Sequence, residues 1–193
     1  IFTVAYVEAS AERIAQLASQ ACVSSIHVHE QPRTFDAPAN TLHRVTSVAA
    51  APYNLTGSGV VLGHIDAGAF FEAHGDFGGR AQMAEAAVAH QHATYTLGYA
   101  IGSGAGNATA RGAAPGATAK GYDYSSNPMA KRRQCRRDFY MDHDNNSWGG
   151  SVVGSGYNYL SEEFDVDARD MGMLSIKASG NEGTSGSIYH GTL

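Results

Sequence analysis

The sequence predicts an α/β fold with a doubly wound, mostly parallel sheet, and two observations support this prediction. Residues 60–66 (VVLGHID) form a near-continuous apolar run that ends in an acid, as is typical of a buried parallel strand. Further strand-like runs alternate with helix-compatible segments: strands at 117–124, 145–149 and 173–180, and helices near 92–102, 129–141 and 160–171. Ligands bind such sheets beyond the carboxyl ends of the strands, so the polar residues that follow each strand are the candidates for function.

The first 30 residues predict a separate, smaller β-α-β unit. Residues 2–7 (FTVAYV) are β-branched and aromatic, and Ser10 is placed to cap a helix that extends to Gln20. A second strand-like run (VSSIHV) follows this helix. The next segment is weakly periodic and contains proline, which predicts a linker with one short helix. We therefore expect three parts: a β-α-β remnant at 1–30, a linker at 31–58 and the main α/β domain at 59–193.

Composition and charge exclude several classes of protein. The 193 residues are 43% hydrophobic, which suffices for one sizeable core. A formal net charge of -5 provides no overall field that would attract nucleic acid or anionic lipid, so we expect no nucleic-acid partner. The longest stretch without charged residues, 86–110, carries histidines, amides and glycines, and we expect no membrane span. The two cysteines are too few and too distant for a disulfide framework or a zinc site.

Asp66 and His92 are placed to form an acid–base pair. Asp66 ends the strand at 60–66, and His92 begins the helix-like segment that follows. A carboxylate that accepts the Nδ1 proton of an imidazole fixes the tautomer of the ring and leaves Nε2 free to act as a general base. Such a pair activates a serine hydroxyl.

Four sequence blocks surround these residues, in chain order TGSGVVLGHIDAG, HGDFGGR, HATYTLG followed by RGAAPGA, and NNSWGG followed by ASGNEG. Together these blocks resemble those of the subtilases, the subtilisin-like serine peptidases. The triad of subtilisin follows the order Asp, His, Ser. The resemblance, which is strongest to a bacterial branch, implies a subtilisin-like fold, a serine endopeptidase that acts on polypeptides, and a secreted or cell-surface location.

The resemblance also implies a role for each matched position. Asp66 would orient His92, His92 would be the general base, and the side-chain amide of Asn181 would donate to the oxyanion. Six further positions would hold an extended peptide by main-chain hydrogen bonds and the walls of a specificity pocket: Ser147, Trp148, Gly149, Ala178, Ser179 and Gly180.

The nucleophilic serine of the family has no match in this chain. In the family it lies in a GTS motif that begins a helix several dozen residues after the oxyanion asparagine, and Leu193 comes before that point. The GTS at 183–185 follows GNEG directly and does not fit that motif. We therefore expect the serine to lie beyond this chain and the chain by itself to hydrolyse no peptide bond. Residues 1–30 would then be the end of a pro-segment.

Two departures from the family pattern indicate a divergent member. Ala67 stands where the family usually has Thr or Ser, which predicts the loss of a hydrogen bond to the carboxylate of Asp66. Ala93 and Tyr95 replace the Gly and the second His of the family's histidine block. These changes favour, as an alternative, a peptide-binding protein without catalytic activity.

Histidines and acids at alternate positions leave open a metal-dependent hydrolase. The pairs are His64 with Asp66, His74 with Asp76, and His90 with His92. They lack the spacing of ligands on a helix, so we expect no catalytic metal and no cofactor. A structural calcium ion stays open, but spacing alone does not place its ligands. We expect His64 to be a hydrogen-bonded histidine of the core.

Two charged segments predict solvated surface. The run KRRQCRR at 131–137 lies in a helix-like segment without an aromatic platform for bases, so it is typical of a solvated basic face. Asp142, His143 and Asp144 are expected in a solvated loop before a strand.

Overall fold

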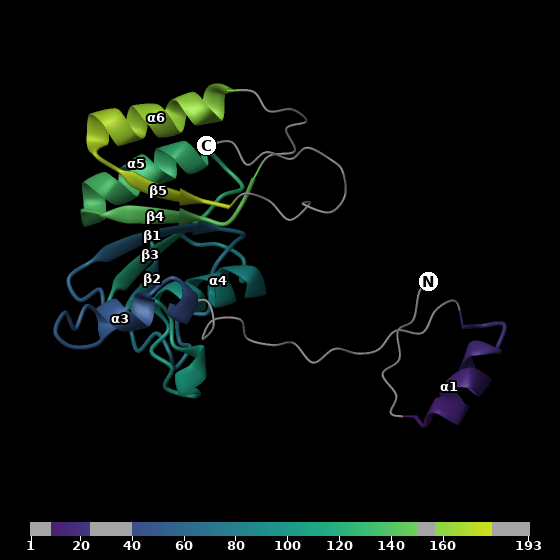
Figure 1. Cartoon of the computed structure of the whole chain (residues 1–193). Coiled ribbons are helices and arrows are strands. Elements are labelled where there is room, and N and C mark those ends of the chain that lie inside the picture. Colours follow the sequence, from purple (N-terminus) through teal and green to yellow (C-terminus); the bar gives the residue numbers. More distant parts are fainter. Residues whose placement is uncertain (1–8, 24–39, 150–156, 179–193) are drawn as a thin grey trace. The chain divides into compact units, whose positions relative to one another are not determined.

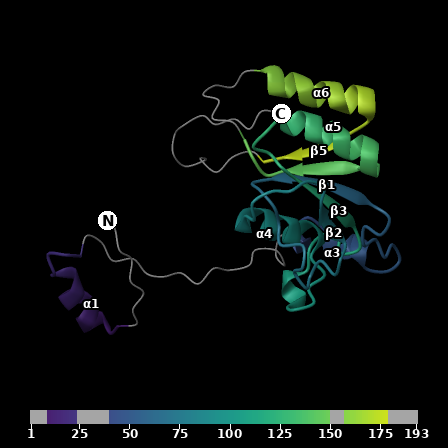
Figure 2. The same ribbon diagram turned by 180° about the vertical axis from the view of Figure 1, so that it is seen from behind.

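The computed structural model describes residues 9–23, 40–149 and 157–178, and the chain divides into two units, 1–34 and 35–193 (Figures 1 and 2). In the first unit, α1 (Ala11–Ala18) begins after Ser10, whose hydroxyl accepts a hydrogen bond from the N–H of Arg13 at 3.4 Å. This contact is an N-cap, as the sequence predicts. The first flanking strand, and the second beyond Val23, lie outside the described residues, so the β-α-β assignment stays a prediction.

The second unit contains a five-stranded sheet in the order β2-β3-β1-β4-β5, with all strands parallel. The strands are β1 (Val61–Asp66), β2 (Ala81–Met83), β3 (Thr118–Asp123), β4 (His143–Asn146) and β5 (Leu174–Lys177). Four of the five overlap the predicted runs, and β2 is a three-residue strand that sequence periodicity misses. The predicted α/β fold with a mostly parallel sheet is confirmed.

Helices lie on both faces of this sheet, α5 and α6 on one side and α4 on the other (Figure 1). The helical segments of this unit include α3 (Val45–Ala49), α4 (Gln91–Ile101), the 3-10 turn η1 (Ala108–Ala110), α5 (Pro128–Phe139) and α6 (Tyr159–Met171), and residues 40–42 are also helical. The three long helices fall where the sequence predicts them; α3 and the helical residues 40–42 both lie in the segment at 31–58, where one short helix was expected.

Each face of β1 contributes to a separate hydrophobic core. Leu62 packs with Ala93 and Leu97 of α4, whereas Ile65 packs with Cys135 of α5. Because side chains alternate along a strand, His64 and Asp66 share the face of Leu62 and point toward α4. The fold thereby directs a buried histidine and a buried carboxylate at the first turns of that helix.

The charged segments at 131–137 and 142–144 are not simply solvated surface, contrary to expectation. Arg132 is fully buried, and its guanidinium donates to Asp144, to Asp167 at 2.8 Å, and to the hydroxyl of Ser175. Asp144 lies within β4 and is also buried. A charged side chain is stable in the interior only when it is paired. The partners of Arg132 lie in β4, α6 and β5, so the sequence around Arg132 does not reveal them.

Candidate active site

Asp66 and His92 meet where β1 ends and α4 begins. His90 caps α4 by accepting a hydrogen bond from the N–H of His92 at 3.2 Å. Nδ1 of His92 lies 2.5 Å from Oδ1 of Asp66. The carboxyl group is 1% exposed and the imidazole is 34% exposed. The structure thus brings the two residues together as predicted, with a buried acid behind a histidine that solvent can reach.

The carboxylate of Asp66 has further donors that the sequence did not indicate. Oδ1 accepts from the backbone N–H of Ala67 at 2.7 Å, and Oδ2 lies 3.0 Å from the hydroxyl of Thr96. The same hydroxyl lies 2.7 Å from the carbonyl oxygen of His92, so its one proton is shared between two acceptors. Thr96 follows His92 by one helical turn, and that spacing was the available signal. The alanine at position 67 therefore does not leave the carboxylate without support.

His64 is a hydrogen-bonded histidine of the core, as predicted. It is 1% exposed, and Nε2 lies 3.1 Å from the carbonyl oxygen of Ala93. Burial lowers the pKa of His64 to about 4, so the ring is neutral at pH 7 and Nε2–H donates to that carbonyl. The bond ties the first turn of α4 to β1, next to the contact between Asp66 and His92.

The segment expected to hold a peptide follows β4 and lies beside the end of β5. The N–H of Ala178 donates to the carbonyl oxygen of Asn146 at 3.1 Å, which continues the strand pairing. Ser147 accepts a hydrogen bond from the side chain of Asn145 at 2.9 Å. Trp148 is half-buried and stacks on Tyr124, with ring centroids 5.9 Å apart. Gly149 is exposed.

Three predicted site residues, Ser179, Gly180 and Asn181, lie outside the described residues. Their assigned roles stay predictions. The six other site residues are described: Asp66 and His92 at the β1–α4 side, and Ser147, Trp148, Gly149 and Ala178 at the β4–β5 side.

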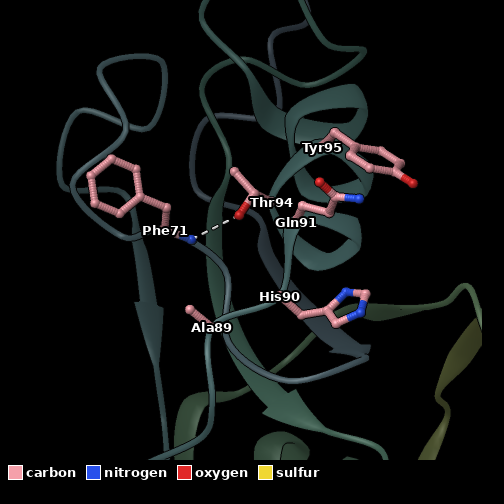
Figure 3. Close-up of a pocket in the computed structure, with 6 residues that line it drawn as sticks. All are labelled: Phe71, Ala89, His90, Gln91, Thr94 and Tyr95. Carbon is pink, nitrogen blue, oxygen red and sulfur yellow. Dashed lines mark hydrogen bonds between the residues drawn. The ribbon is translucent and has the colours of Figure 1, made fainter. Parts of the chain in front are cut away.

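An open pocket lies beside the first turns of α4 (Figure 3). Its lining is Phe71, Ala89, His90, Gln91, Thr94 and Tyr95. The N–H of Phe71 donates to the hydroxyl of Thr94 at 2.9 Å, which joins the two sides of the pocket. The ring centroid of Tyr95 lies 5.3 Å from that of His92.

The histidine–acid pairs at alternate positions form hydrogen bonds within the fold. Asp76 accepts from the N–H of Ala105 at 2.7 Å, and His90 caps α4. No group of three or more His, Cys, Asp or Glu side chains among the described residues is arranged to hold a metal ion. In the same part of the chain, no helix is both long and apolar enough to cross a membrane.

No protein-family model and no curated protein sequence matches the chain. Among solved structures, the chain is similar to the CspB protease of Clostridium perfringens, with a TM-score of 0.61 and 20% sequence identity. The match covers 77% of this chain and 41% of that one, so the chain spans about two fifths of the protease's length. Similarity at this level of identity establishes a shared fold.

Proposed function

We propose that this chain is part of the catalytic domain of a subtilisin-like serine endopeptidase, with the nucleophilic serine supplied by sequence beyond Leu193. The observation that carries the proposal is the 2.5 Å contact between Nδ1 of His92 and the buried carboxylate of Asp66. That contact holds the imidazole in the tautomer that leaves Nε2 free at a ring that solvent reaches. The fold shared with the CspB protease supports an activity on polypeptides.

The reaction is acyl transfer in two stages. The serine oxygen attacks the peptide carbonyl while Nε2 of His92 takes the hydroxyl proton, and Asp66 stabilises the imidazolium that forms. The side chain of Asn181 donates to the oxyanion of the tetrahedral intermediate. His92 then gives the proton to the leaving amine, and water hydrolyses the acyl-enzyme by the same route.

The peptide substrate lies extended along Ser147–Gly149, whose backbone pairs with it as an added strand. In this proposal, Ala178, Ser179 and Gly180 wall the primary specificity pocket. Two observations support this placement. Residues 147–149 follow the end of β4 and are half-buried or exposed, and the N–H of Ala178 pairs with the β4 residue just before them.

The test begins with the coding sequence downstream of the Leu193 codon. The longer chain it encodes is expressed, and hydrolysis of a quenched fluorescent peptide library is measured. Asp66→Asn should lower kcat by about ten-thousand-fold, because the amide favours the wrong imidazole tautomer. His92→Ala should lower kcat by a similar factor. His43→Ala, at an exposed histidine outside the site, serves as the matched control and should retain activity.

Two results would contradict the proposal. The first is activity that survives both Asp66→Asn and His92→Ala. The second is a stop codon directly after Leu193 together with a chain that hydrolyses nothing; peptide binding by that chain would identify the non-catalytic alternative. Activity that a chelator abolishes, in a protein that holds stoichiometric zinc, would instead identify a metal-dependent hydrolase.

A further inference from the structure

Buried polar atoms without hydrogen-bond partners gather at the carboxyl ends of β4 and β5. They are Nζ of Lys177, Nε1 of Trp148 and both amide atoms of Asn146, and none of them has a partner within the described ranges. An unsatisfied buried polar group costs about 1–3 kcal/mol, so several in one place call for an explanation. A ligand that is not part of the structure is one such explanation.

These atoms belong to one cluster. Asn146 and Lys177 are paired residues of β4 and β5, so their side chains lie side by side on the same face of the sheet. Nζ of Lys177 lies 3.9 Å from the centroid of the Trp148 ring. The ring of Tyr124 stacks on the ring of Trp148, and Tyr124 is 39% exposed. The cluster therefore includes Trp148, the middle residue of the segment at 147–149.

The cluster is rich in donors and carries positive charge. The ammonium of Lys177, the indole N–H of Trp148 and the NH₂ of Asn146 all donate, and Oδ1 of Asn146 is the one acceptor among the atoms of the cluster. The carboxylate of Asp144 belongs to the preceding residue pair on the same face; its Oδ2 is paired with Arg132, and its Oδ1 has no hydrogen-bond partner among the described residues. Burial, with the charge of Arg132, lowers the pKa of Lys177 to about 8, as expected for an ammonium without a full counter-charge. Three neighbouring donors, one of them cationic, suit an anionic acceptor.

We propose that this cluster binds the side-chain carboxylate of an Asp or Glu in a bound polypeptide, which makes Lys177 a specificity-determining residue. This inference rests on the proposed function, because the polypeptide is the one that lies along Ser147–Gly149. A carboxylate offers several lone pairs to the three donors and neutralises the ammonium. Because Nζ is buried beneath the indole, the entering carboxylate must turn the Trp148 ring aside.

That movement supplies the assay. Trp148 is the single tryptophan of the chain, so its fluorescence reports on this cluster alone. The 193-residue chain is titrated with hexapeptides that are acetylated and amidated at their ends and differ at one position, Glu, Gln or Leu. The Glu peptide should bind roughly tenfold or more tightly than the Gln peptide, the worth of one charge-assisted hydrogen bond. Lys177→Met should abolish this preference, and Lys177→Gln provides a second variant.

Lys120→Met is the matched control. Lys120 is also a strand lysine whose ammonium lies over an aromatic ring, 4.7 Å from Phe139, but it is hydrogen-bonded to Gln82. This variant should keep the preference for Glu. A neutral peptide with a free carboxyl terminus tests the other source of a carboxylate, and its tighter binding would overturn the assignment to a side chain.

The inference fails if Glu and Gln peptides bind the unaltered chain equally, if no peptide binds, or if Lys177→Met keeps the preference for Glu. These outcomes are separable from failure of the proposed function. A longer chain that hydrolyses peptides without a preference for acidic residues would contradict only the role of Lys177. A chain that prefers Glu peptides but never hydrolyses them would contradict only the catalytic proposal.

Discussion

Arg132 and Lys177 are both cations on the face of the sheet that α5 and α6 cover, and they differ in their partners. The guanidinium of Arg132 is fully buried and donates to Asp144, Asp167 and Ser175. The ammonium of Lys177 is buried at the end of the same sheet; it has no hydrogen-bond partner within the described residues and lies over the ring of Trp148. A charge in the interior is stable when its partners are already present, so the comparison separates a cation that serves the fold from one that awaits a ligand.

On the face of the sheet toward α4, the buried carboxylate of Asp66 differs from the ammonium of Lys177 in the same way. Asp66 is as buried as Arg132, and three donors surround its carboxylate, one from the turn after β1 and two from α4. Such an arrangement is preorganised, which is what a catalytic carboxylate requires. At the β1–α4 side the buried carboxylate therefore has its hydrogen-bond donors within the fold, whereas at the β4–β5 side we propose that a bound substrate supplies the partner.

The largest expected change in the free energy of unfolding follows from the removal of Arg132, the buried cation with hydrogen-bond partners. Arg132→Met leaves the buried carboxylate of Asp144 without its cationic partner and leaves Asp167 with Arg133 alone, and it should lower the free energy of unfolding by about 3–5 kcal/mol. Urea denaturation measures the change. Arg137→Met, at an exposed position of the same helix, should stay within about 0.5 kcal/mol of the unaltered chain. A loss below 1 kcal/mol for Arg132→Met would show that the network does not stabilise the fold.

His64 is a buried titratable group that avoids the cost of a charge by staying neutral. Its pKa is about 4 in the folded chain against 6.5 when unfolded, so the unfolded chain binds more protons between these values. The free energy of unfolding should therefore fall as pH drops from 6.5 to 4, by up to about 3 kcal/mol from this residue. His64→Leu should remove that slope, and His43→Ala should keep it. Equal slopes in the unaltered chain and His64→Leu would refute the assignment.

Thr96 tests whether the carboxylate of Asp66 depends on its side-chain donor. Thr96→Val removes the hydroxyl 3.0 Å from Oδ2 and should lower the free energy of unfolding by about 2 kcal/mol, as for a hydrogen bond to a charged group. Thr118→Val is the control, because the hydroxyl of Thr118 bonds to a carbonyl oxygen at an exposed site. If both variants have the same stability, the donors at Ala67 and His92 suffice for Asp66.

The smallest effect is expected at Lys177 and has the opposite sign. Lys177→Met replaces an unpaired buried ammonium by an apolar chain of similar length, which should leave stability unchanged or raise it by about 1 kcal/mol at pH 7. The measurement is the same urea titration. Destabilisation by more than 1 kcal/mol would mean that the ammonium serves the fold as Arg132 does, and the comparison would lose its basis.

The order of strands and helices was predictable because its signals are local. Apolar runs and their alternation with helix-compatible segments located β1, β3 and β5 and the three long helices. The short strand β2 has too few residues for a period to appear, and β4 was displaced because its polar sequence, His143–Asn146, does not look like a buried strand.

By itself, the sequence determined the α/β class and the placement of Asp66 at a strand end and His92 at a helix start, because both follow from neighbouring residues. Only the tertiary structure decided which charges are buried and what they contact. Arg132 meets Asp144 and Asp167 only after α5, β4 and α6 pack together, and Thr96 reaches Asp66 only once α4 lies on β1. The stability of a buried charge depends on partners that packing supplies, and these partners are distant in the sequence.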